Sequence, residues 1–222
     1  TSSLWNCGQV CTSTERIYVQ EEIYEDFVSE MARNFENVTL GDGLREEVEV
    51  GPMIDEAAFH KVELHIRDAV ERGARILTGG KRSERFERGY FFEPTVIADA
   101  TKDMLCVCEE TFGPTIAIMP YGTIDEAIEL VNSSRYGLGA VIMSTDMKKI
   151  KQFFEDVKAG TIWVNDPLPD NVGGPFGGMK ESGFGDFREL GEEGLEAFME
   201  TKHVHWTFDP RAIQENWFGE EV

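Results

Sequence analysis

The 222-residue sequence has no long apolar run, little basic charge and few cysteines. No hydrophobic stretch approaches the ~20 residues that a membrane-spanning helix needs, so we expect no membrane partner. Lysine and arginine number 21 against 42 aspartate and glutamate residues, and the net charge of −21 would repel nucleic acid and anionic membranes. The acidic residues are spread along the chain, which indicates a solvated surface rather than an acidic tail.

Four cysteines are too few to build a disulfide framework in a chain of this length. Because no signal peptide precedes Thr1, we expect a reducing, cytoplasmic location. A zinc site made of Cys7, Cys11, Cys106 and Cys108 is an alternative use of these residues. Their Cys-x3-Cys and Cys-x-Cys spacings do not match those of structural zinc sites, so we expect no bound metal.

The segment Asn6–Thr12 is a short polar loop that contains glycine and two cysteines, and a strand-like run, Arg16–Gln20, follows it. A thiol at the mouth of a strand can face a cleft, and its thiolate is a strong nucleophile. Most free cysteines, however, are small buried hydrophobic residues. From the spacing alone, Cys11 can be either a nucleophile or a packing residue.

Strand-like and helix-like segments alternate along the chain. Helices are predicted at Glu22–Phe35, Asp55–Arg72, Ile124–Asn132, Met147–Val157 and Glu192–Met199, and strands at Arg16–Gln20, Ala74–Thr78, Thr115–Tyr121, Gly139–Met143, Gly160–Val164 and Thr201–Thr207. We read Cys106–Pro114 as extended and 165–178 as a long functional loop. The alternation predicts βαβ units and an α/β fold with a mostly parallel, doubly wound sheet flanked by helices.

Two of the predicted helices have apolar residues at helical spacing. The buried rows expected from this spacing are Ile23, Phe27, Met31 and Phe35 in the first helix, and Phe59, Val62, Ile66 and Val70 in the second. Asp55 is the expected N-cap of the second helix and Gly73 its stop. The next segment, Ala74–Thr78, is expected to be a buried strand.

Several phrases, in this order, resemble the NAD(P)-dependent aldehyde dehydrogenase family. They are Asn6–Thr12, Gly89–Val96, Glu109–Pro114, Asn132–Leu138, Gly160–Asn165 and Pro175–Gly183. The resemblance covers the C-terminal, catalytic part of the family. It implies a catalytic α/β domain at residues 1–200, an oligomerisation strand and tail at 201–222, and an absent N-terminal cofactor-binding domain. An isolated fragment of this kind is expected to be inactive.

The resemblance also implies roles for individual residues. Cys11 takes the place of the nucleophile that oxidises an aldehyde to a carboxylic acid through a thiohemiacetal and a thioester. Glu110 and Phe112 match the residues that hold the nicotinamide riboside of NAD or NADP. Lys61 falls where the family can contact the adenosine ribose, although Ala58 replaces a glutamine found in some members.

Further residues are expected around the aldehyde. Val10, Thr12 and Phe176 would line the substrate tunnel, and Asp170 stands where many relatives have an aromatic residue. A carboxylate at the tunnel mouth would favour a cationic or polar aldehyde over an alkyl one.

Two features near the C-terminus also match the family. Glu189 resembles a supporting glutamate near the proton path, although Asp186 and Phe187 look like an insertion just before it. The strand Thr201–Thr207 resembles the part of the oligomerisation flap that pairs with another subunit, so we expect a homo-oligomer, either a dimer or a tetramer, that forms through this strand. The alternative to an enzyme is a non-catalytic α/β assembly module in which Cys11 is inert.

Overall fold

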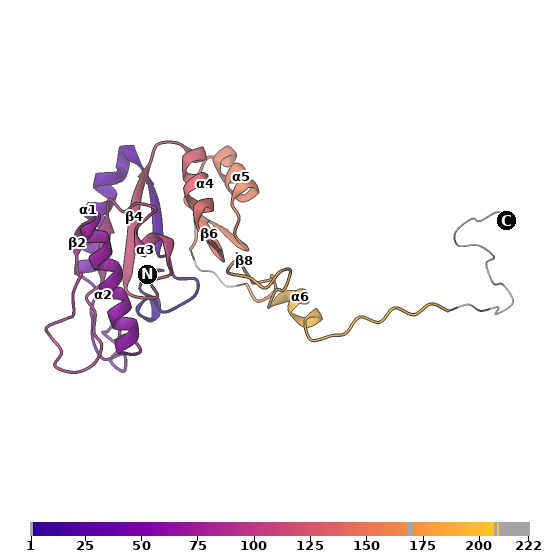
Figure 1. Ribbon diagram of the computed structural model, residues 1–222, viewed down its shortest axis with the longest axis horizontal. Coiled ribbons are helices and arrows are strands. Elements are labelled where there is room, and N and C mark those ends of the chain that lie inside the picture. Colours follow the sequence, from indigo (N-terminus) through magenta and orange to yellow (C-terminus); the bar gives the residue numbers. More distant parts are fainter. Residues whose placement is uncertain (1, 168–170, 207, 209–222) are drawn as a thin grey trace.

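The computed structural model describes residues 2–167, 171–206 and 208, and it confirms the predicted α/β architecture (Figure 1). The strands are β1 (Arg16–Gln20), β2 (Arg75–Thr78), β3 (Thr95–Ala98), β4 (Thr115–Tyr121), β5 (Tyr136–Gly137), β6 (Gly139–Ile142), β7 (Thr161–Val164) and β8 (Met179–Lys180). The α-helices are α1 (Tyr24–Glu36), α2 (Glu56–Glu71), α3 (Leu105–Cys108), α4 (Ile124–Ser133), α5 (Met147–Asp156) and α6 (Gly191–Glu196), and the 3-10 helices are η1 (Trp5–Gly8) and η2 (Glu21–Ile23).

The main sheet has the strand order β1-β4-β3-β2. β1, β4 and β3 run parallel, and β2 is an antiparallel edge strand. β6 and β7 form a separate parallel pair, whereas β5 and β8 form a short antiparallel one. Parallel pairing therefore dominates, as the alternating segments predicted.

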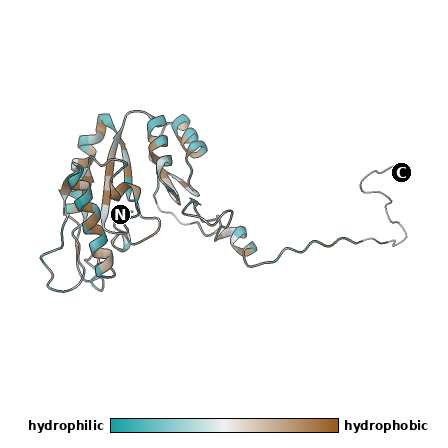
Figure 2. Cartoon of the chain, in the orientation of Figure 1, coloured by the Kyte–Doolittle hydropathy of each residue, from teal (hydrophilic) through white to brown (hydrophobic). Residues whose placement is uncertain are grey.

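The core lies between the main sheet and its helices. The central strands β3 and β4 are buried almost throughout, and α1 and α2 pack against this sheet. A second, smaller core forms where α4 and α5 meet the β6–β7 pair. Figure 2 shows hydrophobic residues in the strands and hydrophilic faces on α4 and α5, as expected for helices that cover a core.

The buried faces of α1 and α2 differ in part from the predicted rows. Ile23 is exposed because it lies in η2, ahead of α1, and Tyr24 and Val28 are buried in its place. In α2 the buried stripe is centred on Val62 and Ala69, so Val70 lies exposed at its edge in the last turn.

Two local predictions were wrong. The strand at 74–78 forms as β2 but is only half-buried, because an edge strand has a neighbour on one side only. The segment 106–114 is not extended throughout, because Leu105–Cys108 forms the single turn of α3. Asp68 of α2 caps this turn from a distance, since its Oδ2 accepts a hydrogen bond from the Leu105 amide at 2.8 Å.

The strand predicted at 201–207 does not form in the part of this segment that the structure describes. Residues 201–206 have no regular secondary structure and run away from the body of the molecule after α6 (Figure 1), and Thr207 lies outside the described residues. A strand needs a neighbour to pair with, so pairing with another subunit remains a prediction. None of the helices in the described part of the chain has the length and apolar character needed to cross a membrane.

β1 and β6 each have one edge without a hydrogen-bonded neighbour in the described part of the chain. Between them lies a hollow of about 500 Å3. Every residue of both strands contributes to its wall, as expected where strand edges rather than faces border a space. This hollow holds the candidate site.

Candidate active site

The cysteine loop, residues 6–12, comes into close contact with the segment that precedes β4. Asn6 and Cys7 adopt left-handed backbone conformations with φ of 50° and 61°. At Gly8, with φ of 73°, an added Cβ would lie 2.0 Å from the carbonyl oxygen of Gly113. Only glycine allows this approach, so Gly8 lets the loop rest directly on the end of the 109–113 segment.

The two cysteines of the loop have opposite environments. Cys7 is 1% exposed, and burial raises the pKa of its thiol to about 12. Cys11 is exposed, in a turn that the Ser13 amide closes by donating to the Val10 carbonyl at 2.9 Å. Of these two thiols, only that of Cys11 can meet a ligand.

The hollow brings together several of the predicted site residues. Val10, Cys11, Thr12 and Glu110 all contribute to its wall. Because the cysteine loop precedes β1 and the 109–113 segment precedes β4, the thiol and the carboxylate come from the amino ends of neighbouring parallel strands. Phe112, two residues after Glu110, is half-buried with a left-handed φ of 57°, and it does not contribute to the wall of the hollow.

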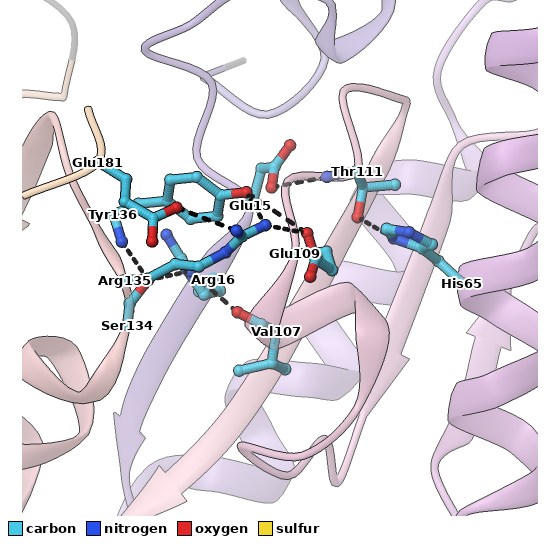
Figure 3. Close-up of polar contacts among 10 residues, drawn as sticks. All are labelled: Glu15, Arg16, His65, Val107, Glu109, Thr111, Ser134, Arg135, Tyr136 and Glu181. Atoms are coloured by element: carbon cyan, nitrogen blue, oxygen red, sulfur yellow. Dashed lines mark hydrogen bonds and ion pairs between the residues drawn. The ribbon is translucent and has the colours of Figure 1, made fainter. Parts of the chain in front are cut away.

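An ion-pair network holds the 109–113 segment from the side of β5. Arg135 pairs with Glu109 and, at 3.0 Å, with Glu181, and Figure 3 shows the guanidinium between the two carboxylates. The Arg135 guanidinium also donates to the Tyr136 hydroxyl at 2.7 Å. Tyr136 itself contributes to the wall of the hollow. The sequence did not predict this role for Arg135, because its partners lie 26 and 46 residues away.

Lys180 of β8 binds the backbone between the end of α4 and β5, next to Arg135. Its Nζ donates to three backbone carbonyls, those of Asn132, Ser134 and Tyr136, at 3.0, 2.8 and 3.3 Å. Partial burial lowers the pKa of this amine, and the carbonyls compensate for the lost water. The run Met179-Lys180-Glu181 gave no local signal of such a cage.

The other predicted residues that the structure describes do not contribute to the wall of the hollow. Lys61 is exposed on α2. Phe176 and Glu189 pair with each other through two backbone hydrogen bonds of 2.5 and 2.8 Å. Asp170 lies outside the described residues. The predicted roles of these four residues remain predictions.

The zinc alternative finds no support in the structure. Within residues 2–167, 171–206 and 208, no group of three or more histidine, cysteine, aspartate or glutamate side chains could hold a metal ion. Cys7 and Cys106 are both buried in the hydrophobic core, whereas Cys11 is exposed.

The fold and the hollow together define a class of protein: an α/β domain in which an accessible thiol and a carboxylate line the same hollow. A family model described as the aldehyde dehydrogenase family matches residues 1–204, and the chain belongs to this family.

Relatives and solved structures agree with this assignment. An aminoaldehyde dehydrogenase from Pisum sativum is 43% identical over 197 residues, covering 89% of this chain and 39% of the relative. A betaine aldehyde dehydrogenase from Bacillus subtilis is 38% identical, covering 97% of this chain and 44% of the relative. A betaine aldehyde dehydrogenase from Staphylococcus aureus, solved with NAD+, superposes with a TM-score of 0.91 at 38% identity, covering 99% of this chain and 43% of that one. The chain thus spans about two fifths of the length of the relatives it matches.

Proposed function

We propose that this chain is the cysteine-bearing part of an NAD(P)-dependent aldehyde dehydrogenase. The observation that carries the proposal is the shared hollow, whose wall includes the exposed Cys11 and Glu110, while Cys7 is enclosed in the core. The overall reaction converts an aldehyde, NAD(P)+ and water into a carboxylic acid, NAD(P)H and a proton.

Cys11 has the central role in this reaction. Its thiolate adds to the aldehyde carbonyl and forms a thiohemiacetal, whose oxyanion can accept a hydrogen bond from the Cys11 backbone amide. Loss of hydride leaves a thioester on Cys11, which water then cleaves to release the acid. A solved relative from Staphylococcus aureus has a BME-modified cysteine, which supports the view that a cysteine of this family can be reactive.

The residues present fit one end of the cofactor, whose bound form would accept the hydride. Glu110 offers a carboxylate that can accept hydrogen bonds from ribose hydroxyls, and Phe112 lies two residues further along the same segment. The sequence has no glycine-rich phosphate loop between a strand and a helix. The phosphates would therefore bind elsewhere in the polypeptide, and the residues that distinguish NAD from NADP would lie there too.

The rest of the polypeptide would also complete the hollow. About three fifths of each relative lies outside the matched part, and β1 and β6 each offer an open edge towards the same space. An extended segment from that remainder would pair with these edges and close the site. The 222-residue chain alone is therefore expected to be inactive.

The names of the relatives support a proposal about the substrate class. Those named above act on aminoaldehydes or betaine aldehyde according to their names, and both compounds are cationic. We extend this preference to the present chain, with Asp170 as the carboxylate that favours the cation. Replacing Asp170 by phenylalanine should lower the ratio of kcat/KM for a cationic aldehyde to that for an alkyl aldehyde of equal length.

Aldehyde-dependent NAD(P)H formation tests the catalytic proposal. The assay compares the 222-residue chain with a longer polypeptide that contains it and has the length of the relatives. Each of the two is assayed unsubstituted, with Cys11→Ser and with the control Cys108→Ser. Turnover is expected only in the longer polypeptide, and Cys11→Ser should reduce it on the order of a thousandfold or more, because the hydroxyl is a far weaker nucleophile.

The controls separate the parts of this proposal. Cys108→Ser, at a half-buried thiol of α3, should keep its activity. Turnover that survives Cys11→Ser would overturn the role of Cys11. Turnover by the 222-residue chain alone would overturn the need for the remaining polypeptide.

We also propose that the protein assembles as a homo-oligomer through residues 201–206. The exposed apolar side chains from residue 184 to the end of the described part support this assignment; they are Phe184, Phe187, Leu190, Leu195, Phe198, Met199, Val204, Trp206 and Phe208. A cytoplasmic location remains a prediction, since some relatives are named as peroxisomal or chloroplastic.

A further inference from the structure

Glu15 lies between the cysteine loop and β1, and its half-buried carboxylate reaches the 109–113 segment. Oε2 accepts a hydrogen bond from the Thr111 amide at 3.0 Å, and Oε1 accepts one from the Phe112 amide at 2.7 Å. Each oxygen therefore serves one amide, across 96 and 97 residues of sequence. Figure 3 shows the carboxylate facing this segment. Such contacts between a carboxylate and two amides are stronger than neutral hydrogen bonds.

These two amides belong to a strained stretch of backbone. Phe112 has a φ of 57°, a conformation that a bulky residue adopts only when its surroundings hold it there. Thr111 is fixed a second time, because its hydroxyl pairs with Nδ1 of the buried His65 at 3.0 Å. Glu15 and His65 thus hold the segment from the start of β1 and from α2.

The residue after Glu15 holds the other end of the same stretch. Arg16 donates from Nη1 to the carbonyl of Val107 and to the hydroxyl of Ser134, both at 2.9 Å. Glu110 lies between these anchored points, with its side chain exposed at the hollow. The position of Glu110 relative to Cys11 is therefore set by side chains only four and five residues beyond the cysteine.

We propose that Glu15 is a positioning residue, which holds the Thr111 and Phe112 amides so that Glu110 and Phe112 keep a fixed place relative to Cys11. The proposal rests on the proposed function, in which these two residues hold the cofactor riboside. Glu15 does not touch the reacting atoms, and it acts through the backbone of the segment that does.

A carboxylate is required because both groups that it meets are donors. The pKa of Glu15 is raised, chiefly by burial and to a smaller extent by the nearby Glu110, whereas the two amides and Arg16 favour its charged form. Glutamine has nearly the same shape but only one oxygen, so its NH2 group would face one of the two N–H groups. Aspartate keeps both oxygens on a side chain shorter by one methylene group.

The first measurement is hydrogen exchange of the backbone amides in the 222-residue chain. In Glu15→Gln, exchange within residues 109–114 should accelerate about ten- to a hundredfold, the effect of losing one charge-assisted hydrogen bond to a buried donor. The matched control is Glu30→Gln, an exposed carboxylate on α1, and it should leave this segment unchanged. Glu15→Asp should give a smaller acceleration confined to the same segment.

The second measurement is made in the longer polypeptide. Glu15→Gln should raise the KM for NAD(P)+ about tenfold, while kcat at saturating cofactor changes less than about threefold, because positioning of the riboside is lost and Cys11 is retained. A merely structural role would lower the active fraction and leave this KM unchanged.

The outcomes distinguish the two proposals. Unchanged exchange at 109–114 in Glu15→Gln, or faster exchange with an unchanged KM for NAD(P)+, overturns the positioning role. If Glu15→Gln does not fold, Glu15→Asp decides, and acceleration spread evenly over the whole chain contradicts the proposal. The exchange comparison needs no activity, so it stands even if turnover survives Cys11→Ser and the proposed function fails.

Discussion

At the scale of single residues, burial decides which thiol of the cysteine loop is available. Cys7 and Cys11 are four residues apart in one short loop. The side chain of Cys7 is buried in the hydrophobic core, whereas Cys11 lies in the wall of the hollow. Cys106 is also buried, and the pKa of its thiol is raised to about 12, chiefly by burial. Because the reactive species is the thiolate, these environments predict a large difference in reactivity.

Alkylation by iodoacetamide at about pH 8 should therefore label Cys11 first, on the order of a hundredfold faster than Cys7 or Cys106. At that pH, well below a pKa of about 12, the two buried thiols remain almost wholly protonated, and they are also enclosed. Peptide mass spectrometry over a time course gives the rate at each cysteine. Cys11→Ser should remove the fast phase, and equal rates at Cys7 and Cys11 would show that the loop opens readily.

The sequence predicted site residues whose roles the family phrases imply, and missed those that act through long-range contacts, even where, as with Arg135, the residue stands inside such a phrase. Cys11 and Glu110 were predicted, and the structure places both at one hollow. Glu15 and Arg135 were not predicted, because their partners lie 26 to 97 residues away and no local pattern indicates them. A charged pair at the start of a strand, here Glu15-Arg16, is the signal that could have drawn attention to the first of them.

At the scale of helices and strands, local chemistry accounts for the elements whose ends are capped locally. Asp55, the predicted N-cap of α2, accepts a hydrogen bond from the Ala58 amide at 2.8 Å. α3 was missed because its cap, Asp68, comes from another helix. The position of the site was also not evident from the fold, since ligands of open α/β sheets commonly bind at the carboxyl ends of strands, whereas Cys11 and Glu110 precede β1 and β4.

The cap of α2 can be tested directly, and the helix matters because its His65 and Asp68 hold the segment beside the site. Asp55→Ala should lower the free energy of unfolding by about 1 kcal/mol, since the Ala58 amide loses its acceptor. Asp55→Asn keeps an acceptor and should lose at most a few tenths of that amount. Urea denaturation followed by circular dichroism measures both. An equal loss in the two variants would show that the charge at the helix N-terminus, not the cap, is the stabilising feature.

At the scale of the whole molecule, the chain has two regions whose hydrophobic cores differ in size. The sheet β1-β4-β3-β2 has a large core of its own, whereas the β6–β7 pair with α4 and α5 has a small one. The alternation of strands and helices predicted parallel pairing but not the separation of β6 from β1, because strand adjacency depends on the packing of the whole sheet. The hollow between them contains the candidate site. A segment that paired with the open edges of β1 and β6 would therefore also close the site.

The apolar C-terminal segment provides the test of assembly. In the 222-residue chain, the double substitution Val204→Ser and Trp206→Ser should weaken self-association about ten- to a hundredfold, the contribution expected from burying these two side chains in an interface. Both are exposed within a single chain, at 68% and 73%, so the fold itself should not change. Leu44→Ser is the matched control, since Leu44 is 94% exposed but lies far from this segment in the sequence.

Light scattering after size exclusion, over a range of protein concentrations, measures the association. Because each chain has a net charge of −21, added salt should strengthen the association of the unsubstituted chain by screening the repulsion between subunits. The double variant should remain monomeric at salt concentrations where the control variant assembles. A molar mass that is the same for the double variant and for Leu44→Ser would place the interface on another surface, and residues 201–206 would then have no part in assembly.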